Sequence, residues 1–266
     1  MLSIIRGTCL TISKSRPLIL HNIKQRLISS GTEEVMSEPS TPSTPTSPAP
    51  EPYGIKTITE EDSEALLGHL RKFFFKDEPL NVAVQLIEYE NSTCAELEKY
   101  SLKSIKEGTS LMAVTNSNHV IGVCLNGTIT NSASDEEENE EDCANVKFSR
   151  VRSFLDFCGK EGTKAIIQKY PDVEKIMFVK IISTDTAWRG KGIAKELMDK
   201  TRKIGRERGY GLIRVDCSSY FSARAVARLG FECVYELKYN DYKENGKPVF
   251  QTEHPHTSFT VYVQKM

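Results

Sequence analysis

A glutamate set between aromatic residues and a proline is the first feature of this sequence that could do chemistry. Phenylalanine occupies residues 73–75, and Asp77, Glu78 and Pro79 follow. Successive side chains on a helix point about 100° apart, so three adjacent rings cannot all face one core from one helix. Because Pro79 disfavours helical geometry at the preceding residue, the sequence predicts an extended Glu78 just past a helix end, beside surplus aromatic surface. A carboxylate next to an apolar wall has a raised pKa and can accept a proton.

Simpler explanations exist for Glu78 and for the other reactive side chains. Glu78 could be an ordinary surface glutamate after a helix, and we expect the competing carboxylate, Asp77, to be structural or to face the solvent. Cys217 has no histidine following it in a supportive pattern, which argues against a Cys–His nucleophile. His254 and His256 flank a proline without further ligands nearby, so we expect no metal site.

A pair of glycines at the start of a predicted helix is the second chemical feature. Gly190 and Gly192 lack Cβ atoms, so the backbone N–H groups of the first turn can approach a ligand closely. Such a helix N-terminus suits a pyrophosphate, and Arg189 and Lys191 add positive charge there. A dinucleotide-binding fingerprint would need a third glycine at Lys195, and the P-loop pattern is absent from the chain. The alternative is a tight turn with incidental basic residues.

The composition is that of an ordinary globular protein. The chain has 266 residues, a formal net charge of -1, 39% hydrophobic and 27% charged residues. Neither sign of charge dominates, so nothing indicates a nucleic-acid or anionic membrane partner. No apolar run approaches the roughly 18–20 residues of a membrane helix. The seven scattered cysteines include no C-x-x-C pair and fit reduced thiols better than disulfides or zinc.

The N-terminal part differs in composition from the rest. Residues 1–31 contain basic residues and no acid, which is typical of a mitochondrial transit peptide or of a disordered extension. Met36 could serve as a later start. Six of the eleven prolines lie in residues 38–52, which we interpret as a linker. We therefore divide the chain into an extension and linker, 1–52, and one folded domain, 53–266.

Alternating helices and strands predict an α/β or α+β domain around a mixed sheet. The segment 175–184 is almost continuously apolar and should be a central strand. The acidic run at 135–142 should be a solvated, mobile loop, with a site for a basic partner as the alternative. Helices are expected at 58–75, 92–108, 146–158, 163–172, 190–208 and 222–230, with a hairpin at 110–129 and strands at 211–219, 231–239 and 258–266.

Three blocks of the sequence resemble one family. The residues from Arg189 to Ala194 match the R/Q-x-x-G-x-G/A signature of GCN5-related N-acetyltransferases (GNAT). In this match, Arg189 or an adjacent residue is the signature residue that precedes the two glycines. The blocks FFFKDEPLN, DTAWRGKGIA and CSSYFSAR together are similar to the insect-type arylalkylamine N-acetyltransferases. The resemblance spans roughly residues 55–266, with the blocks in family order.

This resemblance implies a fold, a cofactor and a set of site residues. The GNAT fold has a mixed, mostly antiparallel sheet whose two middle strands splay apart, with the pantetheine arm of acetyl-CoA between them. The backbone of Ile182, Ser183 and Thr184 would hold the pantetheine. Glu78 matches the family's catalytic glutamate, and Ser218 and Ser222 match serines proposed to assist departure of the CoA thiolate. The pyrophosphate would lie on Arg189, Gly190, Lys191, Gly192, Ile193 and Ala194.

The function implied is acetylation of an arylalkylamine of the dopamine, tyramine, octopamine and serotonin class, by direct transfer in a ternary complex. Ser222 could instead be the N-cap of a short helix. Two other functions stay open: a GNAT enzyme with a different donor or acceptor, such as a fatty-acyl donor, a polyamine or a protein N-terminus, and a non-catalytic acyl-CoA-binding module. The carboxylate beside aromatic residues favours an aromatic amine. We expect a monomer in the cytoplasm, with mitochondria as the alternative if residues 1–31 are a targeting signal.

Overall fold

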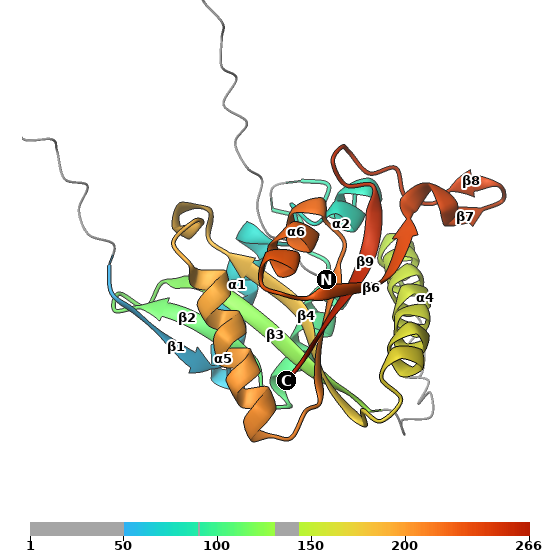
Figure 1. Ribbon diagram of the computed structural model, residues 1–266. Coiled ribbons are helices and arrows are strands. Elements are labelled where there is room, and N and C mark those ends of the chain that lie inside the picture. The colour runs from blue at the N-terminus through green and yellow to red at the C-terminus, as the bar shows by residue number, and fades with distance from the viewer. Residues whose placement is uncertain (1–50, 90, 131–143) are drawn as a thin grey trace, which may run out of the picture. The chain divides into compact units, whose positions relative to one another are not determined.

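The apolar segment 175–184 forms β4 (Lys175–Thr184), the central strand of a seven-stranded sheet (Figure 1). The computed structural model describes residues 51–89, 91–130 and 144–266. Residues 1–50 of the predicted extension and linker, and the acidic run at 135–142, lie outside the described residues. The strand order is β1-β2-β3-β4-β5-β9-β6, and all neighbours are antiparallel except β4 and β5. The predicted mixed, mostly antiparallel sheet is confirmed.

The other strands of this sheet come from both halves of the domain. A two-stranded hairpin, β7 and β8, lies outside the large sheet. The strand bounds are Tyr53–Thr57 for β1, Leu111–Thr115 for β2, Val120–Thr130 for β3, Leu212–Cys217 for β5, Glu232–Lys238 for β6, Lys243–Glu244 for β7, Lys247–Pro248 for β8 and Ser258–Lys265 for β9.

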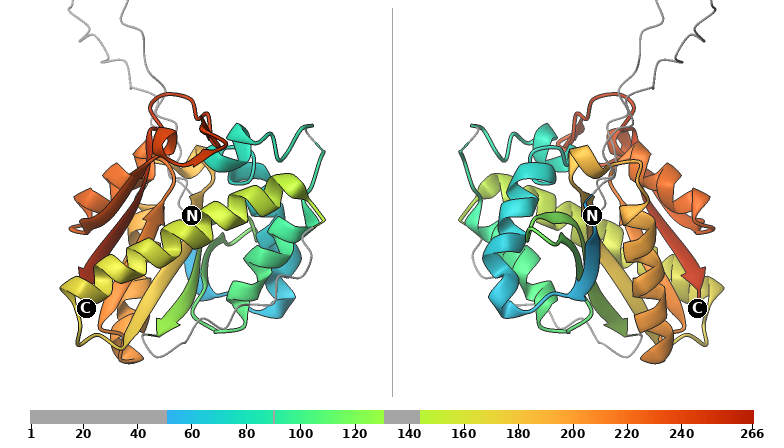
Figure 2. Two further views of the ribbon diagram at one scale, coloured as in Figure 1. Left: turned by 90° about the vertical axis from the view of Figure 1, so that its right-hand side faces the viewer. Right: turned by 90° about the vertical axis from the view of Figure 1, so that its left-hand side faces the viewer.

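Helices cover both faces of the sheet and give two hydrophobic cores. The helices α1 (Ser63–Phe73), α3 (Ala95–Leu102) and α4 (Val146–Lys169) enclose one core, and α5 (Ile193–Glu207) and α6 (Tyr220–Arg228) enclose the other. The two views of Figure 2 show α4 in front of the sheet from one side and α5 from the other. The short elements are α2 at Pro79–Ala83 and single 3-10 turns at Glu60–Asp62, Lys103–Ile105, Thr186–Trp188 and Tyr239–Asp241.

A bulge in β4 determines which of its side chains reach each core. Met177 and Val179 face α5, and Ile182 belongs to the same core although strict alternation would turn it away. The register with β3 shifts so that Lys180 has no direct partner, which reverses the alternation. Ser183 therefore points to the α1 side, where its hydroxyl contacts the His69 ring.

The two middle strands separate at one end, as predicted. β4 and β5 pair in parallel from Ile176 and Leu212 only as far as Val179 and Val215. Both strands continue beyond that point, to Thr184 and Cys217, without pairing to each other. Their facing backbone groups are thus open to another hydrogen-bonding partner.

The predicted elements were mostly found, with a few differences. The separate helices expected at 146–158 and 163–172 are one helix, α4, and neither β1 nor α2 was predicted. The helix expected from Gly190 begins at Ile193, and the one expected from Ser222 begins at Tyr220. In the part of the chain that the structure describes, no helix has the length and apolar character needed to cross a bilayer.

Candidate active site

Glu78 is the N-cap of the short helix α2, and it is completely buried. Its backbone is extended, with φ -72° and ψ 122°, as the following proline predicts. Its Oε2 accepts a hydrogen bond from the backbone N–H of Asn81 at 2.7 Å. Its exposed fraction is 0%, and Oε1 has no hydrogen-bond partner among the described residues. The alternative of a surface glutamate is therefore wrong.

Burial raises the pKa of Glu78 above its ordinary value. The Asn81 N–H and the Ser218 hydroxyl act in the opposite direction, because both stabilise the carboxylate, but burial is the largest cause. A buried acceptor with a raised proton affinity and one free oxygen is well suited to take a proton from a ligand.

The three phenylalanines before Glu78 do not form the surplus aromatic surface that their spacing predicts. Phe73, Phe74 and Phe75 are 9%, 0% and 2% exposed. The helix α1 ends at Phe73, and the N–H groups of Phe74 and Phe75 both donate to the carbonyl of Leu70, at 2.9 and 2.8 Å. Because the chain leaves the helical path there, all three rings reach buried positions. The prediction of surplus aromatic surface is wrong because it assumed that the helix continues through all three residues.

Ser218 lies directly after β5 and is brought to Glu78 by the fold. It is fully buried, and its Oγ has no hydrogen-bond partner in the described chain. Its hydroxyl acts to lower the pKa of Glu78, although no hydrogen bond of normal geometry joins the two groups. The carbonyl of Ser218 accepts a hydrogen bond from the hydroxyl of Tyr239 at 2.5 Å. A hydroxyl and a carboxylate, each buried and each with a free oxygen, thus share one site.

Ser222 occupies a different environment. Its Oγ donates to the carbonyl of Ser219 at 2.8 Å, and its N–H donates to the Ser219 Oγ at 3.0 Å. The N-cap of α6 is therefore Ser219, and the expectation that Ser222 could cap the helix is wrong. Burial raises the pKa of the Cys217 thiol to about 12, and the Ser222 hydroxyl opposes this increase only in part. That thiol stays protonated near neutral pH and is a poor nucleophile.

The glycine loop before α5 presents unsatisfied backbone donors. Gly190 and Gly192 have φ values of +78° and +88°, a conformation that favours glycine. An added Cβ at either position would meet nothing within 4 Å, so the space beside the loop is open. Glu196 N–H donates to the Gly192 carbonyl, whereas the N–H groups of residues 190–195 find no acceptor within the described chain. The loop fits an anion such as a pyrophosphate.

Charged side chains lie at the same loop. The Arg189 guanidinium is 3.9 Å from the Asp77 carboxylate, and the Lys191 ammonium lies 4.7 Å from the centre of the Trp188 ring. Asp77 is 40% exposed. It is an ion-pair partner of the glycine loop and only partly faces the solvent.

The end of β4 supplies the backbone predicted to hold a pantetheine arm. On the β3 side, Ile182, Ser183 and Thr184 pair with residues 122–124, and on the β5 side they have no partner strand. The Ser183 Oγ lies 3.1 Å from His69 Nε2, so this side chain belongs to the α1 packing. Burial lowers the pKa of His69 to about 4, and the ring is therefore neutral near pH 7.

The sequence analysis missed two contributors to the site, and only one of them had a local signal in the sequence. Asn81 follows Glu78 at capping distance, so the spacing could have indicated its hydrogen bond. Tyr239 is remote in sequence from the site, and nothing local predicts its contact with Ser218.

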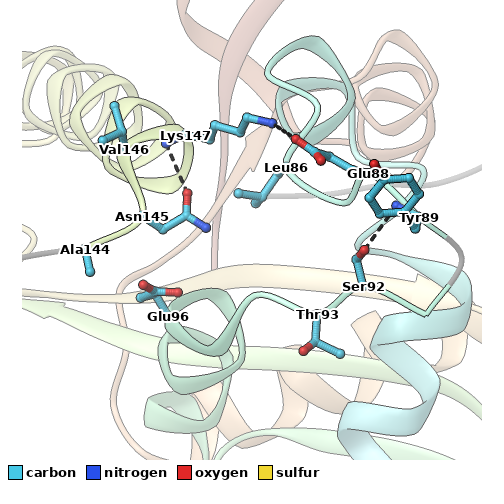
Figure 3. Close-up of a pocket in the computed structure, with 10 residues that line it drawn as sticks. All are labelled: Leu86, Glu88, Tyr89, Ser92, Thr93, Glu96, Ala144, Asn145, Val146 and Lys147. Carbon is cyan, nitrogen blue, oxygen red and sulfur yellow. Dashed lines mark hydrogen bonds and ion pairs between the residues drawn. The ribbon is translucent and has the colours of Figure 1, made fainter.

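A surface groove is lined by residues of the segments 86–96 and 144–147 (Figure 3). Its volume is about 580 Å³, and none of its lining residues is a predicted site residue. The Glu88 carboxylate and the Lys147 ammonium pair with each other in it. Elsewhere, His256 Nδ1 accepts a hydrogen bond from the Tyr220 N–H at 3.3 Å. No group of three or more potential metal ligands occurs among residues 51–89, 91–130 and 144–266.

Comparisons with known proteins identify the family of this chain. A model of the acetyltransferase (GNAT) family matches residues 83–231, more than half of the chain. The chain belongs to the GNAT family. This GNAT protein is similar to the solved structure of arylalkylamine N-acetyltransferase 2 from Aedes aegypti, with 31% identity and a TM-score of 0.73, over 80% of this chain and 98% of that one.

Two more distant structures share its fold. One is the polyamine N-acetyltransferase of Drosophila melanogaster, described as forming N-acetylagmatine, with 22% identity and a TM-score of 0.69, over 81% of this chain and 100% of that one. The other is mosquito arylalkylamine N-acetyltransferase like 5b, with 21% identity and a TM-score of 0.71 over the same shares. The protein is therefore an acetyltransferase of a family that uses acetyl-CoA.

Proposed function

We propose that this GNAT enzyme transfers the acetyl group of acetyl-CoA directly to the primary amine of an arylalkylamine, with Glu78 as the general base. The observation that carries the proposal is the state of Glu78, which is fully buried with one unpartnered oxygen. The similarity to an arylalkylamine N-acetyltransferase at 31% identity supports the acceptor class.

The amine must lose a proton before its nitrogen can attack. An aliphatic amine with a pKa near ~10 is almost fully protonated at pH 7, and its deprotonation costs about 4 kcal/mol there. Glu78 can accept this proton on Oε1, the oxygen that makes no hydrogen bond in the described chain. Its raised pKa favours the transfer, because it brings the proton affinity of the base closer to that of the amine.

The glycine loop and the end of β4 form the proposed acetyl-CoA site. The N–H groups of the loop, Arg189 to Ala194, suit the pyrophosphate, and the open edge of Ile182, Ser183 and Thr184 suits the amide groups of pantetheine. When bound there, acetyl-CoA supplies the acetyl group as a thioester.

The two serines are proposed to assist the departing thiolate to different degrees. Ser218 has a free, buried hydroxyl beside Glu78, so it can pass the proton that Glu78 accepts from the amine on to the CoA thiolate released when the thioester C–S bond breaks. The hydroxyl of Ser222 is engaged by the Ser219 carbonyl, so it would first have to give up that bond. We therefore assign Ser218 the larger part.

A panel of amines tests this function. The full chain and residues 53–266 are incubated with acetyl-CoA and with dopamine, tyramine, octopamine, serotonin, agmatine or spermidine, while free CoA is followed. We expect turnover with the aromatic amines by both proteins. Turnover with the polyamines alone would contradict the acceptor class, and acetyl-CoA binding without turnover would indicate a binding module.

The cellular location is a separate proposal. We infer that the enzyme acts as a monomer in the cytoplasm, with mitochondria as the alternative if residues 1–31 are a targeting signal. A fluorescent reporter fused to residues 1–35 distinguishes the two locations. Size-exclusion chromatography with light scattering tests the monomer.

A further inference from the structure

Tyr239 reaches the active site from a distant edge of the sheet. It follows β6, which is separated from β5 by β9 in the strand order. Its side chain is buried, and its hydroxyl donates to the Ser218 carbonyl at 2.5 Å. Its own backbone N–H donates to the Thr257 carbonyl at 3.1 Å. Both ends of the residue are thus held by hydrogen bonds.

The ring of Tyr239 is fixed by aromatic packing. Its centre lies 5.8 Å from that of Phe154 on α4 and 6.3 Å from that of Phe250. Burial, followed by the nearby Glu78 carboxylate, raises the pKa of Tyr239 well above 10. The hydroxyl therefore stays protonated and acts as a fixed donor.

Ser218 needs such a donor because the sheet no longer holds it. The pairing of β5 with β4 ends at Val215, and its pairing with β9 ends at Cys217. Ser218 is the next residue, beyond the last ladder position on either side. The hydrogen bond from Tyr239 to its carbonyl thus restrains the point at which the chain turns from β5 into α6.

We propose that Tyr239 is a positioning residue that fixes the Ser218 carbonyl and thereby holds the Ser218 hydroxyl beside the Glu78 carboxylate. This inference rests on the proposed function, in which these two side chains take part in proton transfer. A small displacement of a catalytic group is sufficient to slow a reaction strongly, which is why one hydroxyl outside the reacting atoms matters.

A double-mutant cycle tests the proposal with the full chain. Tyr239→Phe keeps the ring and removes the hydroxyl, and Ser218→Ala removes the group that is positioned. Each should lower kcat about tenfold, with KM for acetyl-CoA within about twofold. The double variant should also lose about tenfold, because Tyr239 acts through Ser218. A loss of about a hundredfold in the double variant, or no loss in Tyr239→Phe, would overturn the proposal.

Tyr242→Phe is the matched control. Tyr242 packs on the same Phe154 ring, at 4.9 Å between centres, and its hydroxyl makes no hydrogen bond within the described residues. This variant should retain wild-type kcat. If it lost as much as Tyr239→Phe, the effect would belong to the aromatic cluster and the proposal would fail.

A measurement without turnover separates this proposal from the proposed function. The Glu78 carboxyl is titrated by carbon-13 NMR, with Glu78→Gln to assign its signal. Ser218→Ala and Tyr239→Phe should each raise the pKa of Glu78, since both deprive the carboxylate of the Ser218 hydroxyl, and the double variant should raise it no further. An unchanged titration in Tyr239→Phe, or failure of that variant to fold, overturns the proposal even if no amine is acetylated.

Discussion

Asp216 and Glu78 are both buried carboxylates, but only Asp216 has an ionic partner. The Asp216 oxygens accept from the Arg214 guanidinium at 2.7 and 2.8 Å. Glu78 accepts one N–H and retains an oxygen with no partner among the described residues. A buried polar atom without a partner has a free-energy cost, and this cost is larger for an atom of a group that can carry a charge. The comparison indicates that Asp216 stabilises the fold, whereas the unpartnered oxygen of Glu78 supports its proposed role toward a ligand.

The partners of Arg214 support this assignment. The guanidinium also donates to the Thr163 hydroxyl at 2.9 Å and to the Gly159 carbonyl at 3.3 Å, both on α4. A Cβ on Gly162 would lie 3.0 Å from Arg214 Nη2 and 2.8 Å from a methyl of Val261. The glycine thus lets α4 approach the sheet closely enough for these bonds to form.

The largest expected effect is the loss of turnover in the Glu78→Gln variant. This substitution keeps the shape of the side chain and removes the base. We expect kcat to fall by roughly 10²- to 10⁴-fold, the usual contribution of a general base. The defect should shrink as the pH rises toward the amine's own pKa near ~10, because the solvent then supplies free amine. Acetyl-CoA affinity should be nearly unchanged. Steady-state rates from pH 6 to 10 provide the test.

Asp77→Asn serves as the contrast to this variant. Asp77 forms only a partly exposed ion pair with Arg189 on the glycine loop, so Asp77→Asn should change acetyl-CoA affinity and turnover little and leave the pH dependence of kcat unchanged. If Asp77→Asn were the crippling change and Glu78→Gln were mild, the base would be wrongly assigned.

The next effect is on stability and concerns Asp216→Asn. Removing one member of a buried ion pair leaves the other charge uncompensated, so unfolding free energy should fall by about 3–5 kcal/mol. Urea denaturation followed by circular dichroism measures this. The control is Asp199→Asn, because Asp199 is half-exposed between Lys195 and Arg202 and should contribute less than about 1 kcal/mol. A loss of similar size in both variants would remove the distinction between the two carboxylates.

The backbone N–H groups of the glycine loop resemble Glu78 in having no partner among the described residues, and we propose that they also bind a ligand. Acetyl-CoA at a hundred times its Kd should stabilise the wild type by about 2.7 kcal/mol. Gly190→Val or Gly192→Val should abolish this shift in Tm, because a branched side chain would occupy the open space. Gly246→Val is the control, since Gly246 also has a positive φ and open surroundings. Unchanged affinity in both loop variants would exclude this loop as the phosphate site.

The smallest effect is again at Glu78, now on stability. Burial raises its pKa in the folded state above the unfolded value of 4.5, so its contribution to stability is present below that value and is lost as the pH rises through the folded pKa. Glu78→Gln should therefore stabilise the protein near pH 8 by about 1 kcal/mol, roughly 2–4 °C in Tm, and give no gain at pH 4. A lower Tm at pH 8 would mean that the carboxylate supports the fold as Asp216 does.

Features that depend on neighbouring residues were predictable from the sequence. The central strand at 175–184, the hairpin around 116–119, the extended Glu78 before Pro79 and the glycines before α5 all follow from hydrophobic pattern or backbone preference. The same local signals, matched to family blocks, identified the GNAT fold. They also suggested a break within 146–172, where tertiary packing instead keeps α4 continuous through two glycines.

Only the tertiary structure decided how the side chains of the site are used. Glu78, Ser218 and Tyr239 come from segments far apart in the chain, and no local rule states that they meet. The fold buries the carboxylate, leaves the Ser218 hydroxyl free and engages that of Ser222. Burial and hydrogen-bond satisfaction depend on the complete set of packed neighbours, whereas sequence spacing reports only the nearest ones along the chain.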